Sequence, residues 1–173
     1  MKNEPPFNRS SLLKLLTAEN ISYSLHEHEA FYTVKDAEMN RGRMSGIHTK
    51  NIFLKNKKNQ FFLFSCYEKR SIDLKKLSKS FGLGNISFAN EERLFEILGV
   101  LPGSVSPFGL LNDNNKLVKF FIDKKILESD EVNFHPLENT STVTLAVKDF
   151  MEFLIKRNII IYSIDYETYS FIC

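Results

Sequence analysis

The chain has 173 residues, of which 43% are hydrophobic and 25% charged, and its net charge is +2. This length suits one well-packed domain and is short for two, and the composition is that of an ordinary soluble globular protein. No apolar run approaches the roughly 18–20 residues that cross a bilayer, and the N-terminus lacks the apolar core of a signal peptide. We therefore expect a single domain over residues 1–173, in the cytoplasm and without a membrane partner, with residues 1–7 and 166–173 as terminal extensions.

The sequence contains little that would hold a metal or a covalent intermediate. Cys66 and Cys173 form neither a disulfide framework nor a paired metal motif. His26 and His28 are spaced so that both imidazoles would share one strand face, where a metal could bind, but no third ligand accompanies them. We find no Gly-rich phosphate loop and no motif supporting a Ser-His-Asp or Cys-His arrangement. We expect no metal, no cofactor and no covalent mechanism.

Hydrophobic periodicity and turn signals predict a mixture of helices and strands in the first half of the chain. Ser10 or Ser11 is expected to cap the first helix, whose apolar side contains Leu12 and Leu16. The later elements are a strand at 21–25, a short helix at 33–41, a strand ending at 55, a turn at 56–59, a strand at 61–65 and a helix at 73–81 that stops at Gly82.

The second half continues the mixture without a strict βαβ rhythm. We first expect a strand at 86–88, a helix from the cap Asn90 to Gly99, a loop at 100–108 and a strand into Leu111. A turn at 112–115 then leads to a strand at 117–122 and a short helix near 124–128. The last expected elements are paired strands near 132–136 and 142–145, a helix at 148–157 and a strand at 159–164. This pattern predicts an α+β fold with a mixed β-sheet surrounded by helices.

Positive charge is concentrated in one part of the chain. Residues 50–79 hold nine Lys and Arg against Glu68 and Asp73, a surplus of +7, so the rest of the chain carries −5. One basic region on an otherwise acidic molecule suits a polyanion bound on one side. The alternative is a solvated helix face, since Lys75, Lys76 and Lys79 have helical spacing, and the sequence leaves both readings open.

Lys50 and Asn51 follow a flexible Ser45-Gly46 step and are expected at the mouth of an apolar strand. An ammonium and a carboxamide side by side at a strand start can grip an ester, a carboxylate or a ribose phosphate. The alternative is a solvated lysine at a sheet edge.

Two further segments could take part in chemistry. The 103–107 loop begins with a glycine that lets the backbone approach a ligand and ends with a proline that fixes its far end, so its amides could hold an oxyanion. His135 precedes a proline, which favours an extended backbone, and could orient a water, donate to a leaving oxygen or bind a ribose hydroxyl. A common turn and a structural histidine are the alternatives.

Five segments, in order and at suitable spacings, resemble the prolyl-tRNA synthetase-associated editing family, the YbaK-like domains. They are 48–55 (HTKNIFLK), 72–77 (IDLKKL), 98–108 (LGVLPGSVSPF), 111–113 (LND) and 132–140 (VNFHPLENT). The resemblance covers about residues 8–165 and is closest to the free-standing branch that hydrolyses alanine mischarged on proline tRNA. It implies the YbaK-like fold and deacylation of Ala-tRNA(Pro) in trans, without metal or covalent intermediate, with the ribose hydroxyl of the tRNA assisting.

The resemblance also implies roles for individual residues. Lys50 matches the signature active-site lysine of the family, Asn51 lines the same site, and His135 would help seat the substrate or its water. The residues of the loop would bind the aminoacyl carbonyl through backbone amides: Gly103, Ser104, Val105, Ser106 and Pro107.

The expected partners are the acceptor end of tRNA and prolyl-tRNA synthetase, and the oligomeric state stays open. Lys55, Lys57 and Lys58 would meet acceptor-stem phosphates, with Lys55 nearest the site, through contacts that position the tRNA without reading its sequence. Two alternatives remain. The same fold could clear Cys-tRNA(Pro) or Ser- or Thr-charged tRNA, or it could be a non-catalytic tRNA- or synthetase-binding module.

Overall fold

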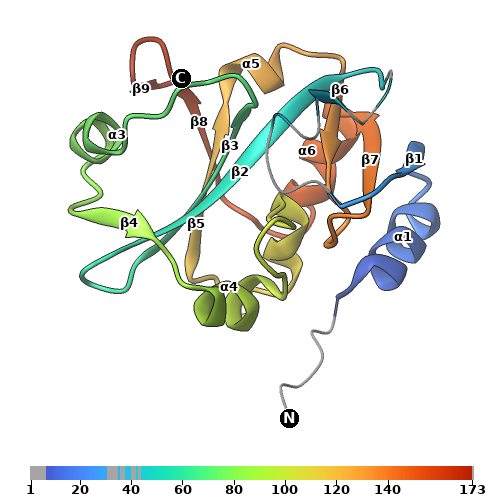
Figure 1. The fold of residues 1–173 in the computed structure, drawn as a ribbon, viewed down its shortest axis with the longest axis horizontal. Coiled ribbons are helices and arrows are strands. Elements are labelled where there is room, and N and C mark those ends of the chain that lie inside the picture. The colour runs from blue at the N-terminus through green and yellow to red at the C-terminus, as the bar shows by residue number, and fades with distance from the viewer. Residues whose placement is uncertain (1–6, 31–34, 36–37, 40–41, 43, 173) are drawn as a thin grey trace.

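The computed structural model describes residues 7–30, 35, 38–39, 42 and 44–172. These residues form a nine-stranded sheet flanked by helices (Figure 1). The strands are β1 (Tyr23–Glu27), β2 (Ile47–Asn56), β3 (Phe61–Tyr67), β4 (Ile86–Phe88), β5 (Val118–Asp123), β6 (Glu131–Phe134), β7 (Ser141–Ala146), β8 (Ile161–Asp165) and β9 (Ser170–Phe171). The helices are α1 (Arg9–Ala18), α3 (Leu74–Phe81), α4 (Glu91–Leu98), α5 (Lys124–Leu127), α6 (Val147–Ile155) and the 3-10 helix η1 (Pro107–Leu111).

The sheet is mixed, as predicted. Its strand order is β1-β7-β6-β2-β3-β5-β8-β9, with β4 pairing only to β2. The β2–β6, β3–β5 and β5–β8 pairs are parallel, and the other pairs are antiparallel. The expectation of an α+β fold with a mixed sheet surrounded by helices is therefore confirmed.

Alternation along β2 sends side chains into two separate cores, because successive residues of a strand point to opposite faces. Phe53 belongs to the large core, which contains Leu12 of α1, Leu98 of α4 and Phe150 of α6. The adjacent Leu54 belongs to the small core instead, which α3 covers with Leu77. The two faces of β2 consequently have different surroundings along its whole length.

One edge of β2 is left open in the middle. The other edge pairs with β3 from Thr49 to Lys55. On the open side, β6 pairs with Ile47 and His48, and β4 pairs with residues 54–56. Between these two pairings, no strand among the described residues pairs with β2 from Thr49 to Phe53. We call this stretch the open edge of β2; at its far end the Phe53 carbonyl accepts the Ala89 amide at 3.0 Å.

The start of the first helix was predicted at the wrong residue. Asn8, rather than Ser10 or Ser11, caps α1, because its carboxamide oxygen accepts the Ser11 amide at 3.0 Å. Ser11 sits three residues later, and its hydroxyl accepts the Asn8 amide at 2.8 Å, which completes a reciprocal capping box.

The expected strand into Leu111 is also wrong, because residues 107–111 form η1. Pro107 at the first helical position has a backbone angle suited to a helix, and the Ser106 hydroxyl accepts the Phe108 amide at 3.3 Å. Phe108 then packs edge-on against the rings of Phe134, Phe150 and Phe153.

Residues 166–172 continue the sheet, because β9 pairs with β8 and Tyr166 is buried in the small core. The expected helix at 33–41 falls almost entirely outside the described residues, as do residues 1–6 of the expected N-terminal extension. In the part of the chain that is described, no helix has the length and apolar character to cross a membrane.

Candidate active site

Lys50 and Asn51 lie inside β2 rather than at its mouth, as its fourth and fifth residues. The strand begins earlier than expected because Ile47 and His48 pair in parallel with β6 before the β3 pairing starts. Neighbouring strand residues point to opposite faces, so the ammonium and the carboxamide are not side by side as predicted. Both residues still lie on the open edge.

Lys50 is on the small-core face of β2. Its cross-strand partner is Cys66, and its ammonium donates to the backbone carbonyl of Arg70. Burial raises the pKa of the Cys66 thiol to about 12, so this group stays protonated at neutral pH and is not available as a nucleophile. Unlike the thiol, the half-buried Lys50 ammonium has a charge to offer a substrate.

Arg70 is itself held by a buried carboxylate. Its Nε donates to one oxygen of Asp123 at 3.0 Å and its Nη2 to the other at 3.3 Å, which is the bidentate arrangement of an arginine and a carboxylate. The Asp123 side chain has no exposed surface. The pKa of the Arg70 guanidinium is raised, chiefly by its hydrogen bond to Asp123. Sequence reasoning did not single out either residue.

Asn51 points to the large-core face. Its carboxamide oxygen accepts the hydroxyl of Ser65, its cross-strand partner, at 2.5 Å. Its Nδ2 makes only a long contact of 3.5 Å with the hydroxyl of Thr49, which in turn donates to the Asn133 carbonyl at 2.8 Å. The side chain thus fixes the β2–β3 pairing while retaining a donor for another acceptor.

His135 follows directly after β6, the strand that pairs with the start of β2. The parallel β2–β6 pairing ends with His48 opposite Asn133, two residues before Lys50 on one strand and two before His135 on the other. The His135 Nδ1 is 2.8 Å from the Ser141 carbonyl, which can only accept, so Nδ1 carries the proton. Burial lowers the pKa of the imidazole, which keeps the ring neutral at pH 7 and leaves Nε2 as an acceptor.

His28, which the sequence suggested only as a conceivable metal ligand, lies beside His135. Its ring lies 6.0 Å from that of His135. Its Nδ1 is 2.7 Å from the Glu29 carbonyl and its Nε2 is 2.8 Å from the Thr142 hydroxyl, so both nitrogens are engaged. Among the described residues, no group of three or more His, Cys, Asp and Glu side chains could hold a metal ion.

The 103–107 loop joins α4 to η1 and turns its middle toward the large core, on the face that carries Asn51. Val105 packs against this core. The Ser104 amide is already used by the Leu101 carbonyl at 3.0 Å. For the amides of Val105 and Ser106, the described part of the chain offers no hydrogen-bond acceptor. The Gly103 amide has no such acceptor either, so three amides of the loop, rather than all four, are left for a ligand.

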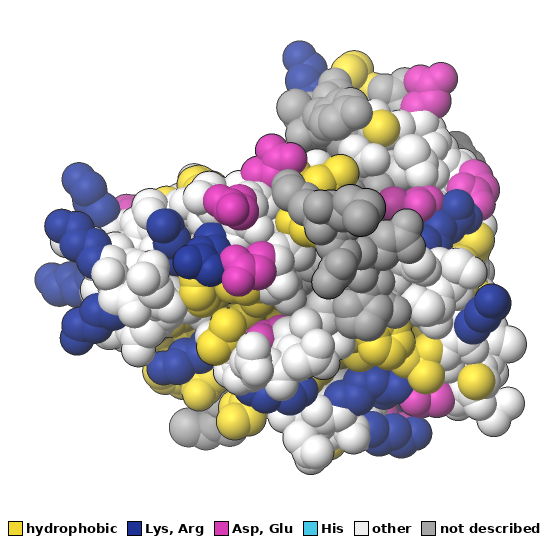
Figure 2. Space-filling model, turned by 90° about the horizontal axis from the view of Figure 1, so that it is seen from below, with side chains coloured by type: hydrophobic (Ala, Val, Ile, Leu, Met, Phe, Trp, Pro, Cys, Tyr) yellow, Lys and Arg dark blue, Asp and Glu magenta, His cyan; other side chains and the backbone are white. Residues whose placement is uncertain are grey.

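Apart from Lys69, the exposed lysines of the basic region form a separate surface, which we call the basic end: Lys57, Lys58, Lys75, Lys76 and Lys79. Figure 2 shows basic side chains gathered at the left of the molecule, the end that holds α3, β4 and the β2–β3 turn in Figure 1. Lys57 is seven residues from Lys50, or roughly 23 Å along the strand. Lys55 is five residues away and on the other face, and Arg70 lies closer to Lys50 than Lys55 does.

A model of the aminoacyl-tRNA editing domain matches residues 28–153, which include β2, the loop and His135. The chain belongs to this family. The resemblance to prolyl-tRNA synthetase-associated editing domains is thereby confirmed, and so is the expectation of an aminoacyl-tRNA editing enzyme, a deacylase.

Two relatives and one solved structure show how far the similarity of this editing domain extends. The prolyl-tRNA editing protein ProX of Acetoanaerobium sticklandii is 34% identical over 151 residues, covering 87% of this chain and 92% of the relative. The prolyl-tRNA synthetase associated domain-containing protein 1 of Bos taurus is 35% identical over 151 residues, covering 84% of this chain and 88% of the relative. The crystal structure of a candidate trans-editing enzyme for prolyl tRNA synthetase has a TM-score of 0.63 at 20% identity, covering 90% of this chain and 93% of that one, and shares the fold.

Proposed function

We propose that this chain acts as a single editing domain that hydrolyses, in trans, the ester between alanine and the terminal adenosine of tRNA(Pro). The need for such an enzyme is physical, because a synthetase pocket for proline discriminates poorly against a smaller apolar amino acid. The similarity to the relative named prolyl-tRNA editing protein, over 92% of its length, supports proline tRNA as the carrier.

The observation that carries the proposal is the group of residues around the open edge of β2. Lys50 and Asn51 project from opposite faces of this edge, and the neutral His135 follows β6, the strand that pairs with the start of β2. No strand covers the backbone between them within the described residues, so an ester placed at this edge can be reached from both faces of the sheet. The fold offers these groups on rigid strands, which favours precise positioning.

In the proposed reaction, water attacks the carbonyl carbon of the aminoacyl ester. A carbon–oxygen bond forms to the water, the bond to the ribose oxygen breaks, and the water proton ends on the ribose oxygen. The His135 Nε2 accepts a hydrogen bond from the water or from the neighbouring ribose hydroxyl. The Lys50 ammonium binds the ribose side of the ester and stabilises negative charge on the departing oxygen.

The carbonyl oxygen requires donors as it becomes an oxyanion. We assign this role to the amides of Val105 and Ser106 together with Asn51, whose Nδ2 makes only a 3.5 Å contact within the protein. An aminoacyl ester is already activated, so positioning and oxyanion stabilisation suffice without a covalent intermediate. The protonated Cys66 thiol is consistent with this assignment.

The acceptor stem would lie along β2 toward the basic end. The distance of roughly 23 Å from Lys50 to Lys57 is comparable to several base-pair steps of an RNA helix, so Lys57 and Lys58 would contact phosphates away from the ester. Prolyl-tRNA synthetase is the proposed protein partner, because relatives of this chain are named for their association with it.

Release of labelled amino acid from a panel of charged tRNAs tests the proposed specificity. The panel contains Ala-tRNA(Pro), Cys-tRNA(Pro), Ser-tRNA(Pro) and Ala-tRNA(Ala), each with the purified chain. We expect the fastest release from Ala-tRNA(Pro). Release of cysteine or serine alone would mean that the enzyme is specific for that amino acid rather than for alanine. Equal release from Ala-tRNA(Ala) would mean that the enzyme does not select tRNA(Pro). Binding without any release would leave only a tRNA-binding module.

A further inference from the structure

The segment that follows β3 provides a fixed acceptor for the Lys50 ammonium. The Arg70 amide donates to the Tyr67 carbonyl at 2.9 Å, which closes a tight turn. The carbonyl of Arg70 leaves this turn toward β2 and accepts the Lys50 ammonium. The position of the catalytic lysine therefore depends on the position of this turn.

Asp123, at the end of β5, holds the turn through several hydrogen bonds. Its carboxylate binds the Arg70 guanidinium at two atoms and also accepts the Tyr67 amide at 3.1 Å. The same carboxylate caps α5 by accepting the Lys125 amide at 3.0 Å. Because the side chain of Asp123 is fully buried and that of Arg70 only 18% exposed, this pair is screened little by water.

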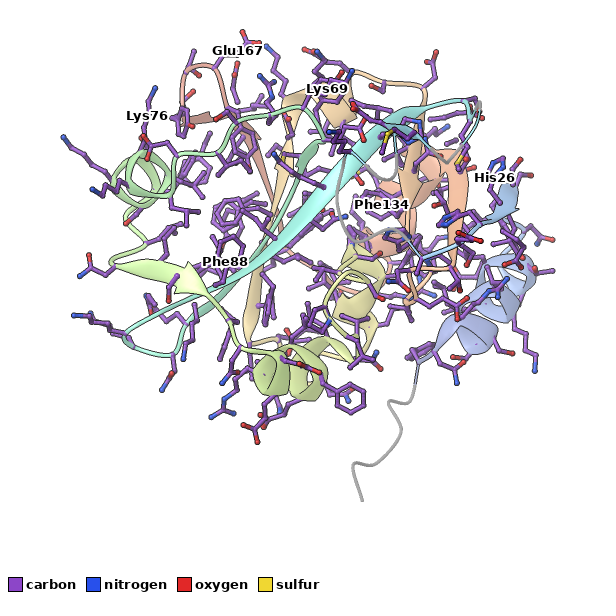
Figure 3. The ribbon with its side chains drawn as sticks, viewed as in Figure 1. His26, Lys69, Lys76, Phe88, Phe134 and Glu167 are labelled. Carbon is purple, nitrogen blue, oxygen red and sulfur yellow. The ribbon has the colours of Figure 1, made fainter. Side chains whose placement is uncertain are left out.

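The C-terminal hairpin supports the same turn from the other side. Glu167, in the turn between β8 and β9, lies 3.5 Å from Arg70, and the ring of Tyr166 lies 6.0 Å from the Arg70 guanidinium carbon. Figure 3 shows Glu167 and Lys69, the neighbour of Arg70, at the same end of the molecule. The hairpin lies outside residues 28–153, so this support is added to the part of the chain that matches the family model.

We propose that Arg70 is a positioning residue for Lys50, and that its ion pair with Asp123 fixes the carbonyl that orients the Lys50 ammonium. The catalytic role of Lys50 in this inference rests on the proposed function. The orientation of the Lys50 side chain does not depend on that function. A lysine side chain has four rotatable bonds, so an acceptor on a rigid turn removes conformations that an editing reaction cannot use. A displacement of about 1 Å in a catalytic group can cost about 100-fold in rate.

The test uses the full chain in three variants and a matched control. Arg70→Gln removes the charge and the bidentate contact, Arg70→Lys retains only the charge, and Asp123→Asn weakens the partner. The control is Arg93→Gln, which removes an exposed arginine whose ion pair with Glu96 lies on the surface of α4. Two quantities are measured for each variant: kcat and KM for alanine release from Ala-tRNA(Pro), and the rate at which acetic anhydride acylates Lys50, relative to the exposed Lys57, by mass spectrometry.

We expect Arg70→Gln and Asp123→Asn to lower kcat by about tenfold with little change in KM, and to raise the acylation of Lys50 relative to Lys57. Arg70→Lys should lie between these variants and the wild type, and Arg93→Gln should match the wild type. Unchanged kcat and unchanged Lys50 acylation in Arg70→Lys and Arg70→Gln would overturn the inference. If Arg70→Gln fails to fold, the kcat and the Lys50 acylation of Arg70→Lys alone test the inference. If the wild type releases no amino acid, the proposed function fails, while the acylation ratio still tests the positioning of Lys50.

Discussion

Lys50 and Asn51 are consecutive in the chain, yet they project from opposite faces of β2 and have different hydrogen-bond partners. The lysine binds the Arg70 carbonyl on the small-core side, and the asparagine binds the Ser65 hydroxyl on the large-core side. In the proposed function, both residues would serve one site at the open edge of β2.

The contact between Asn51 and Ser65 should be visible as an energetic coupling. Ser65 is fully buried, so Asn51→Ala leaves its hydroxyl without an acceptor, and we expect a loss of about 1–3 kcal/mol in the free energy of unfolding. The double variant Asn51→Ala/Ser65→Ala should lose less than the sum of the single variants. Urea denaturation of the four proteins measures the cycle. Strict additivity would mean that the two side chains do not stabilise one another.

The glycine before β2 is required for steric reasons, and the variant Gly46→Ala tests this requirement. Gly46 has φ +78°, and a Cβ there would lie 2.9 Å from the carbonyl carbon and oxygen of Glu131 in β6. Gly82, the C-cap of α3, has φ +64° with nothing within 4 Å, so Gly82→Ala is a matched control for the backbone cost alone.

We expect Gly82→Ala to cost about 1 kcal/mol and Gly46→Ala to cost more, by about 1–3 kcal/mol, because it also displaces β6. Thermal or urea unfolding provides the comparison. Equal losses at the two positions would show that β6 can move away without cost. Since β6 leads into His135, Gly46→Ala should also slow editing.

The neutral state of His135 predicts a pH dependence of stability. Its pKa in the folded chain lies below 6.5, so below pH 6.5 the unfolded chain binds a proton that the folded chain does not. The free energy of unfolding should therefore fall as the pH drops from about 6.5 toward the folded pKa, by at most about 1.4 kcal/mol per pH unit from this group. His135→Asn keeps a donor for the Ser141 carbonyl and removes the titration. Its stability profile should be flatter than that of the wild type, and identical profiles would contradict a buried neutral histidine.

The basic end should contribute to tRNA affinity through phosphate contacts. Lys57→Ala/Lys58→Ala should weaken binding of tRNA and reduce the slope of log K against log salt by about 2, one for each lost phosphate contact. Lys148→Ala, an exposed lysine at the start of α6 and outside the basic end, serves as the control and should leave the slope unchanged. Equal slopes in the double variant and the wild type would place the acceptor stem elsewhere.

Features of the fold that depend on neighbouring residues could be predicted from the sequence. Asp73 and Gly82 delimit α3 as expected, because a carboxylate cap and a left-handed glycine act within a few residues. The β2–β3 hairpin was predicted for the same reason. The Asn56 side chain accepts the amides of Lys58 and Gln60 at 2.9 and 3.0 Å and thereby fixes the turn between the two strands.

Features of the fold that depend on residues far apart in the chain could not be predicted from the sequence. The start of β2 is set by β6, which lies more than 80 residues away in sequence, so Lys50 and Asn51 were expected before the strand rather than inside it. The pairing of Arg70 with Asp123 joins β3 to β5 across 53 residues and leaves no periodic signal. The 3-10 helix at Pro107 was hidden because proline after serine also fits a loop that leads into a strand.

In the proposed function, the lysine on the open edge of β2 carries the editing reaction. The most direct measurement is single-turnover release of alanine from Ala-tRNA(Pro) by the wild type, Lys50→Ala and the control Lys148→Ala, with circular dichroism and thermal unfolding of each protein. We predict that Lys50→Ala keeps its fold and loses about 100-fold or more in rate, whereas Lys148→Ala retains the wild-type rate. A folded Lys50→Ala variant that releases alanine as fast as the wild type would contradict the claim.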